Sequence, residues 1–152
     1  MKTESSELVV VCGGGGFIGG HLVADLLRQG HRKIRVVDVK PFEEWYQLFP
    51  EAENLRLDLQ EKDACETASR DAQIVYNLAA DMGGMGFIER NRVECLRSIL
   101  INTNLIEEAY KAGVERYFFS SSACVGKIPH KTSARRLVAR LTIRTLARCE
   151  RS

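Results

Sequence analysis

A cluster of glycines near the start of the chain lies between an apolar run and a helical pattern. Residues 8–22 read LVVVCGGGGFIGGHL, in which Gly13, Gly16 and Gly19 have the spacing G-x-x-G-x-x-G. A dinucleotide pyrophosphate needs backbone N–H groups aimed at it, room that a Cβ would fill, and the positive end of a helix. A glycine run alone is equally compatible with a flexible loop, but the flanking strand and helix favour a phosphate-binding turn. We therefore expect Gly13 to make the tight turn, Gly16 to admit the phosphates and Gly19 to let helix and strand pack closely.

A carboxylate ends the second apolar run of the chain. Asp38 lies about 20 residues after Gly19, where dinucleotide-binding units place an acidic side chain that accepts hydrogen bonds from the adenosine ribose. The negative charge of Asp38 would repel a 2′-phosphate, so NAD is expected rather than NADP. The basic neighbours Arg35 and Lys40 weaken that preference.

Apolar runs alternate with helical patterns along the first 120 residues. Strands are expected at residues 7–12, 34–38, 54–57, 73–79 and 115–120, helices at 17–29, 60–70 and 88–112, and loops at 41–50 (or a short helix) and 82–87. Most of the strands are apolar throughout, which indicates a parallel sheet covered by helices on both faces. The predicted fold class is α/β, a Rossmann-like doubly wound parallel sheet that stops after its fifth strand.

The polar and small residues of the pattern fall where the predicted strands end. These positions are the glycine turn, Asp38, Asp58, residues 79–86 and residues 120–124. Ligands of such sheets bind beyond the carboxyl ends of the strands. Along the first helix, the apolar positions expected to share a face are Phe17, Ile18, Leu22, Leu26 and Leu27, and those of the long helix are Ile88, Leu96, Ile99, Leu100, Leu105 and Ala109. Gly30 and Gly113 are placed to end these two helices.

Charge divides the chain at about residue 125. The net charge is +2 overall, but residues 1–125 carry 14 Lys+Arg against 19 Asp+Glu, and residues 126–152 carry 8 Lys+Arg against Glu150 alone. We expect residues 1–125 to be one NAD-binding domain and residues 126–152 to be a basic tail. The five cysteines contain no C-x-x-C pair, so neither a disulfide framework nor a metal site is expected. The polar N-terminus lacks the apolar core of a signal peptide, which predicts a cytoplasmic protein.

The motifs at the predicted strand ends resemble those of one superfamily. They are CGGGGFIGGHL, Asp38, Asp58-Leu59, NLAAD and SSSAC. Together they resemble the extended short-chain dehydrogenase/reductases, the NAD-dependent nucleotide-sugar epimerases and dehydratases, over about residues 7–125. Within that superfamily, the long and unusual run NLAADMGGMGFI with SSACV is similar to the GDP-mannose 3,5-epimerases.

The resemblance implies roles for the matching positions. The implied NAD-binding residues are Gly13, Gly16, Phe17, Ile18 and Gly19 at the pyrophosphate, Asp38 at the ribose, Asp58 and Leu59 at the adenine, and Ala79 and Ala80 along the cofactor. The implied substrate-binding residues, for a nucleotide sugar of the GDP-mannose class, are Gly83, Gly84, Met85, Ser122, Ala123 and Cys124.

Two of these residues carry the implied chemistry. In the family, NAD oxidises C4 of the sugar, which acidifies the neighbouring C–H groups, and C4 is later reduced again. Cys124 matches the acid/base cysteine that moves such a proton, and Ser122 matches the hydroxyl that hydrogen-bonds the reacting oxygen. A thiol suits this task because its ordinary pKa lies close to working pH. The structural alternatives are a buried thiol for Cys124 and a backbone-capping hydroxyl for Ser122.

The chain departs from the family pattern after Val125. Gly126 stands where the family has a tyrosine, and no tyrosine follows Tyr117, so the Y-x-x-x-K pair that deprotonates the C4 hydroxyl is absent. We therefore expect a cofactor domain with weak or no activity alone, whose residues 126–152 are a non-native or frame-shifted ending. The four-residue spacing of Arg136, Arg140, Arg144 and Arg148 would give a basic helix for membrane or nucleic acid, but an ending without selected function is favoured.

Two other functions stay open at this stage. One is a non-catalytic NAD- or nucleotide-binding regulatory module that pairs with a full-length homologue through an open sheet edge, so a homo-oligomer is possible. The other is a different sugar-nucleotide epimerase or dehydratase reaction. Cys124 argues against simple 4-epimerisation, which removes no proton from the carbon beside the carbonyl.

Overall fold

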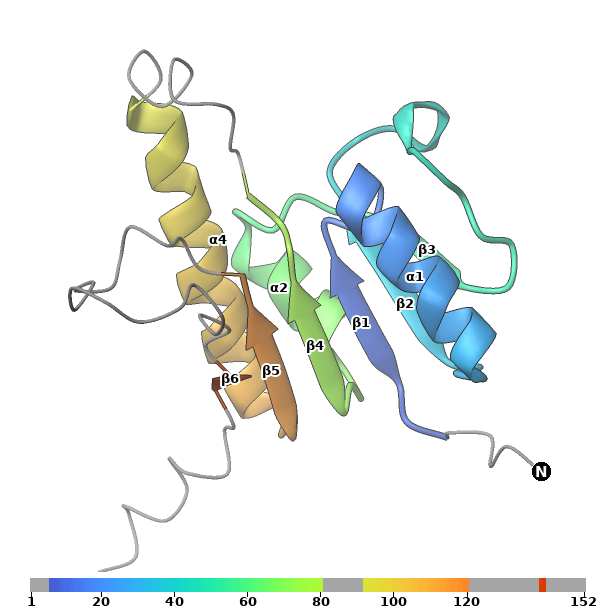
Figure 1. The fold of residues 1–152 in the computed structure, drawn as a ribbon. Coiled ribbons are helices and arrows are strands. Elements are labelled where there is room, and N and C mark those ends of the chain that lie inside the picture. Colours follow the sequence, from blue (N-terminus) through green and yellow to red (C-terminus); the bar gives the residue numbers. More distant parts are fainter. Residues whose placement is uncertain (1–5, 81–91, 121–139, 142–152) are drawn as a thin grey trace, which may run out of the picture.

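The sheet follows the order β3-β2-β1-β4-β5-β6 in the computed structural model, which describes residues 6–80, 92–120 and 140–141 (Figure 1). The strands are β1 (Val9–Cys12), β2 (Ile34–Asp38), β3 (Glu53–Arg56), β4 (Ile74–Asn77), β5 (Arg116–Phe119) and β6 (Arg140–Leu141), and the helices are α1 (Phe17–Gln29), the 3₁₀ turn η1 (Phe42–Glu44), α2 (Lys62–Ser69) and α4 (Arg92–Lys111). Strands β1 to β5 are parallel, as predicted, and β6 adds two antiparallel residues beside β5. These two tail residues are therefore extended rather than helical.

Strand β1 lies in the interior of the sheet, between β2 and β4, and all four of its side chains are buried. Its last residue, Cys12, pairs with Val37 of β2 and with Asn77 of β4. The three central strands thus end at the same level. The loops that leave them meet at one edge of the sheet, which is the topological requirement for a ligand site there.

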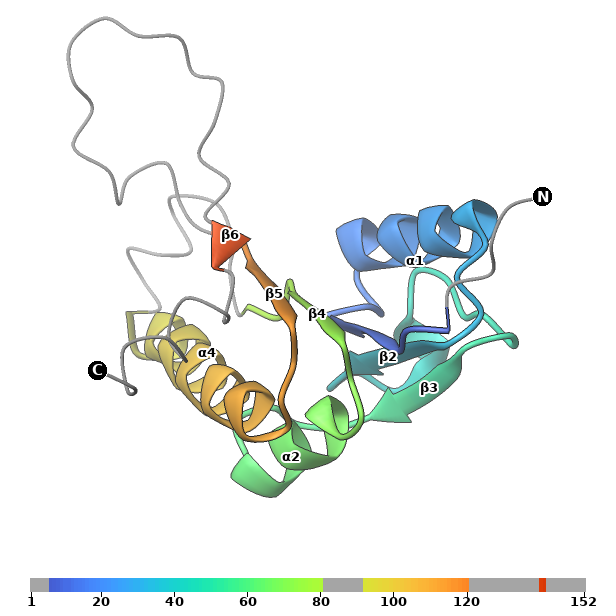
Figure 2. The ribbon, with the colours of Figure 1, turned by 90° about the horizontal axis from the view of Figure 1, so that it is seen from below.

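Helices cover both faces of the sheet, and Figure 2 shows α1 on one side with α2 and α4 on the other. Alternate residues of β1 point to the two layers. Val9 and Val11 belong to the apolar cluster that includes Val23 of α1. Val10 and Cys12 belong to the cluster that includes the α2 and α4 residues Cys65, Ala68, Leu105 and Ala109.

Apolar residues in the N-terminal halves of α1 and α4 are more exposed than the periodicity of these helices predicted. Phe17 and Ile18 are 62% and 71% exposed, whereas Val23 and Leu26 hold the face of α1 against the sheet. In α4, Leu96, Ile99 and Leu100 are exposed, whereas Leu105 and Ala109 are buried. Figure 1 shows the reason, because both helices begin beyond the carboxyl ends of the strands, where there is no sheet beneath them. Within the described residues, no helix combines the length and the apolar character that a membrane span requires.

A buried polar network joins β4, β5 and α4 beneath the strand ends. The amide Nδ2 of Asn77 donates to the Tyr117 hydroxyl at 3.0 Å and to Asn102 Oδ1 at 3.2 Å. Asn77 Oδ1 accepts from the backbone N–H of Ala79 at 3.2 Å. The network therefore fixes the chain where it leaves β4.

Tyr117→Phe should lower the free energy of unfolding by about 1–2 kcal/mol, because Asn77 loses one of its buried partners. Urea denaturation monitored by circular dichroism measures the change. The matched control is Tyr110→Phe, at an exposed side chain in the last turn of α4, which should change the free energy by less than about 0.5 kcal/mol. Equal effects of the two substitutions would contradict the role of this network.

Two cysteines lie in the core between the sheet and α2. Burial raises the pKa of the Cys12 thiol well above its ordinary value, and the charges of Cys65 and Asp38 add to the effect. Burial likewise raises the pKa of Cys65 to about 12, with smaller contributions from Glu108 and Asp58. Both thiols therefore stay protonated in the folded chain at working pH.

Stability should fall with rising pH because of these thiols. In the unfolded chain a cysteine ionises near pH 8.5, so the contribution of each thiol is full below that pH and is lost as the pH rises from there through the raised pKa of the folded chain. Between pH 8 and pH 10 the loss should be about 1 kcal/mol or more per thiol. Urea unfolding at both pH values tests this, and Cys65→Ala should show a smaller decline than the wild type. An equal decline in the two proteins would contradict the expectation.

Candidate functional site: a dinucleotide cavity at the strand ends

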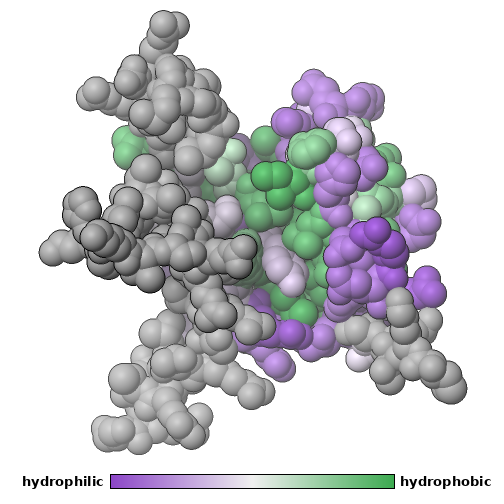
Figure 3. All heavy atoms as spheres, viewed as in Figure 1, coloured by the Kyte–Doolittle hydropathy of each residue, from purple (hydrophilic) through white to green (hydrophobic). Residues whose placement is uncertain are grey.

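A cavity of about 530 Å³ lies at the carboxyl ends of β1, β2 and β4. Its lining residues are Gly13, Gly16, Asp38, Val39, Lys40, Leu57, Asp58, Leu59, Gln60, Leu78, Ala79, Ala80, Arg97 and Ile101. Figure 3 shows hydrophobic residues gathered at the centre of the molecular face that α1 covers in part. The cavity combines an apolar lining with backbone groups and a few charged side chains, which is the usual composition of a cofactor site.

The glycine turn follows β1 closely and leaves one side open. The N–H groups of Gly13 and Gly14 both donate to Val37 O, at 2.8 and 3.1 Å, which ties the turn to β2. Gly13 has φ +78°, and a Cβ there would lie 2.8–2.9 Å from the backbone of Leu78 and Ala79. Among the described residues, a Cβ on Gly16 would in contrast meet only Gly13 O, at 3.4 Å, and Gly16 lines the cavity.

Asp38 connects the end of β2 to the glycine turn. Its Oδ2 accepts from Gly15 N and its Oδ1 from Lys40 N, both at 3.1 Å. The residue is 9% exposed and lines the cavity. A carboxylate oxygen has more than one acceptor site, so these two hydrogen bonds leave capacity for the hydroxyl groups of a ribose.

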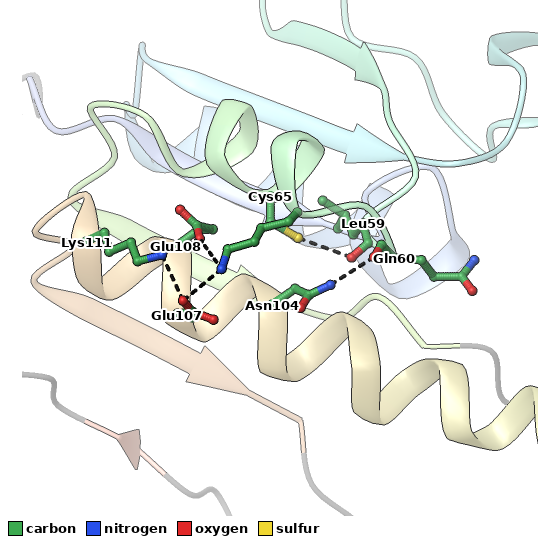
Figure 4. Close-up of polar contacts among 8 residues, drawn as sticks. Leu59, Gln60, Cys65, Asn104, Glu107, Glu108 and Lys111 are labelled. Atoms are coloured by element: carbon green, nitrogen blue, oxygen red, sulfur yellow. Dashed lines mark hydrogen bonds and ion pairs between the residues drawn. The ribbon is translucent and has the colours of Figure 1, made fainter.

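The loop after β3 is positioned by side chains from α2 and α4 (Figure 4). The Cys65 thiol donates to Leu59 O at 3.1 Å, and Asn104 Nδ2 donates to Gln60 O at 2.8 Å. Asp58 Oδ1 accepts from Gln60 N at 3.0 Å. The loop thus presents Asp58 and Leu59 to the cavity in a fixed conformation.

An ion cluster joins the same two helices farther from the cavity (Figure 4). Lys62 of α2 and Lys111 of α4 lie 2.9 and 2.8 Å from Glu107, and Lys111 lies 2.9 Å from the buried Glu108. Hydrogen bonds from Lys111 and Lys62 lower the pKa of Glu107 to about 2. We interpret the cluster as a structural link between α2 and α4, since its charges compensate one another.

The structure brings most of the predicted cofactor residues into one cavity. Those that line it are Gly13, Gly16, Asp38, Asp58, Leu59, Ala79 and Ala80. Gly19 packs inside the turn, where its Cβ would lie 2.2 Å from Gly13 O, and the side chains of Phe17 and Ile18 are exposed at the start of α1. Gly83, Gly84, Met85, Ser122, Ala123 and Cys124 lie outside the described residues. The individual roles of all these residues stay predictions.

Sequence reasoning missed several residues of the cavity. Leu57, Gln60 and Leu78 adjoin predicted residues and would have been found by extending the strand-end rule by one position. Arg97 and Ile101 belong to α4, and no local signal marks them because only the packing of that helix brings them to the cavity. Among residues 6–80, 92–120 and 140–141, no group of three metal-ligating side chains occurs.

The residues present fit an NAD molecule. The turn has the open side that a pyrophosphate requires, and a buried carboxylate stands at the neighbouring strand end where a ribose would lie. Ala79 and Ala80 also line the cavity, and their small side chains leave room for a ligand. The cavity therefore combines a glycine turn with an acidic side chain, as a dinucleotide site requires.

Comparison with known proteins identifies the class. The model of the NAD dependent epimerase/dehydratase family matches residues 9–139, and the chain belongs to this family. The match confirms the resemblance to the short-chain dehydrogenase/reductase epimerases and supports NAD as the cofactor. It also runs past residue 125, where the charge of the chain changes.

Individual relatives are longer than this chain. GDP-mannose 3,5-epimerase 1 of Oryza sativa subsp. indica is 39% identical over 118 residues, which are 77% of this chain and 31% of that protein. The chain thus spans about a third of the length of the curated relatives it matches.

Solved structures of this family share the fold. UDP-glucose 4-epimerase of Thermus thermophilus, in complex with NAD, superposes with a TM-score of 0.70 at 29% identity, and the match covers 88% of this chain and 44% of that one. MoeE5 in complex with UDP-glucose and NAD gives a TM-score of 0.68 at 29% identity, with 93% of this chain and 46% of that one covered. These similarities confirm the Rossmann-like parallel sheet.

Proposed function

We propose that this chain is the NAD-binding part of a nucleotide-sugar epimerase acting on a substrate of the GDP-mannose class. The observation that carries the proposal is the convergence of Gly16, Asp38, Asp58 and Ala79 on one cavity at the strand ends. The similarity to a rice GDP-mannose 3,5-epimerase and the run MGGMGFI at residues 82–88 favour this substrate class. The cytoplasmic location and the domain boundary at residue 125 are parts of the same proposal.

The chemistry follows from the residue types. When bound, NAD supplies the reversible oxidation of a sugar hydroxyl to a carbonyl. In this chain, Cys124 would remove a proton from the carbon beside that carbonyl, and Ser122 would hydrogen-bond the reacting oxygen. Gly83, Gly84, Met85 and Ala123 would lie against the sugar nucleotide. These 152 residues contain no tyrosine after Tyr117, and we propose that they are weakly active or inactive alone, because a missing general base typically costs ~10²–10⁴-fold in rate.

Turnover in D₂O separates the substrate classes. The chain is incubated with NAD and either GDP-mannose or UDP-glucose, and proton NMR follows deuterium incorporation at C3 and C5 of the sugar. We expect trace incorporation into GDP-mannose, none into UDP-glucose, and none with Cys124→Ser. Incorporation into UDP-glucose alone would contradict the substrate class, and a rate typical of complete enzymes would contradict the weak activity.

A second candidate function is a non-catalytic NAD- or nucleotide-binding or regulatory module that pairs with a full-length homologue, and such a surface would also promote self-association. The exposed apolar positions Leu96, Ile99 and Leu100 of α4 favour it, as does the β5 edge, which pairs with only two residues of β6 in the described structure. An exposed apolar helix face and an open sheet edge both promote association. Size-exclusion chromatography with light scattering should show a dimer if this module function holds, and a monomer at high micromolar concentration would argue against it.

A further inference from the structure

The segment after β2 packs directly on the glycine turn. The single tryptophan of the chain, Trp45, is 8% exposed, and its Nε1 donates to Lys40 O at 3.0 Å. The next residue, Tyr46, donates its backbone N–H to Gly15 O at 2.9 Å. The Tyr46 ring also contacts Phe17 with a centroid distance of 4.8 Å. Residues 40–46, which we call the brace, therefore contact the chain at Gly15 and Phe17.

Gly15 is adapted to this contact. Its φ lies outside the left-handed region, so backbone conformation does not require a glycine there. A Cβ on Gly15, however, would lie 2.8 Å from three atoms of the Trp45 ring. The indole ring thus occupies the space that a side chain at position 15 would need, so this packing suits a glycine there.

Both backbone groups of Gly15 are consequently fixed. Its N–H donates to Asp38 Oδ2 at 3.1 Å, and its carbonyl accepts from Tyr46. The peptide between Gly15 and Gly16 then has a defined orientation. Gly16 lines the cavity and is also the N-cap residue of α1. The brace therefore acts on the part of the turn where the pyrophosphate is expected.

We propose that Trp45 and Tyr46 are positioning residues that hold the glycine turn in its dinucleotide-binding conformation. The inference rests on the proposed NAD site and adds residues that contact the turn rather than the ligand. A turn held in its binding conformation before the ligand arrives loses less conformational entropy on binding. Removal of the brace should therefore weaken the binding of a pyrophosphate more than it weakens the binding of a nucleoside.

A double-mutant cycle on the full chain tests the brace. Calorimetry gives the Kd for NAD of the wild type, Gly15→Ala, Trp45→Ala and the double variant, each checked for folding by circular dichroism. We expect each single variant to bind about tenfold more weakly, and the double variant to bind no more weakly than the poorer single, because Trp45→Ala makes room for the new methyl group. Losses that multiply in the double variant, or folded single variants that bind as the wild type does, would overturn the proposal.

Two further measurements separate positioning from general stability. ADP carries the pyrophosphate and adenosine does not, so Trp45→Ala should weaken ADP binding about tenfold and leave adenosine binding within about twofold. Equal losses for both ligands would overturn the proposal. If Trp45→Ala does not fold, Trp45→Leu replaces it in the double-mutant cycle and in the comparison of ADP with adenosine, and the same outcomes test the proposal. A wild-type chain that binds neither NAD nor ADP would overturn the proposed function itself. If the wild type binds both ligands and the variants have the same Kd values, only the positioning role of Trp45 and Tyr46 is overturned.

Discussion

Gly19→Ala should lower the free energy of unfolding by about 3 kcal/mol or more, because overpacking costs about 1–3 kcal/mol in ordinary cores and more where the backbone must shift. A Cβ at this position would lie 2.2 Å from Gly13 O and 2.6 Å from the Cα of Gly14. Both neighbours are backbone atoms of a turn that hydrogen bonds tie to Val37, so they cannot move aside as a flexible side chain would. Urea denaturation measures the loss.

Gly16→Ala is the matched control in the same turn. Among the described residues its Cβ would meet only Gly13 O, at 3.4 Å, and Gly16 has φ −81°, so the fold should tolerate the methyl group at a cost of about 1 kcal/mol or less. Because Gly16 lines the cavity, however, we expect the methyl group to enter it and to weaken NAD binding about tenfold or more. Loss of stability in Gly16→Ala equal to that in Gly19→Ala would contradict the assigned geometry of the turn.

Asp38→Ala should weaken NAD binding by about tenfold to a hundredfold. The substitution removes the proposed ribose acceptor and also leaves the N–H groups of Gly15 and Lys40 without their carboxylate partner. Hydrogen bonds to a charged group contribute about 1.5–3 kcal/mol each, which corresponds to this range. Isothermal titration with NAD at constant ionic strength measures the effect.

The carboxylate should also set the choice of cofactor. Asp38→Asn keeps an acceptor oxygen but removes the negative charge, so the affinity ratio of NAD to NADP should fall while NAD binding is partly retained. The control is Asp25→Ala, which removes an acidic side chain from the exposed side of α1 and should change neither the NAD nor the NADP affinity. An unchanged ratio in Asp38→Asn would show that the charge of Asp38 does not face the 2′ position.

Local patterns were sufficient to predict the elements around the turn. The bounds of α1 and β2 agree with the prediction, and Gly30 ends α1 with φ +98°. These successes share a cause, because a strand, a glycine turn and a capped helix are defined by neighbouring residues. The convergence of Asp38, Asp58 and Ala79 followed from a general rule about parallel sheets rather than from any single motif.

Tertiary packing determined what the sequence did not reveal. The periodicity of α1 placed Phe17 and Ile18 with Leu26, but it carries no information on where the sheet beneath the helix ends. Arg97 reaches the cavity because α4 extends beyond the strands. Trp45 lies in a proline-bounded stretch without periodicity, so its contact with the turn was visible only in the fold.

Titration of NAD into the folded wild-type chain, with calorimetric detection up to millimolar concentrations, tests the central claim most directly. We expect a saturable, weak interaction with one site per chain that is lost in Gly16→Ala. No heat of binding from a wild-type sample with the circular dichroism of an intact α/β fold would contradict the assignment of the cavity to a dinucleotide.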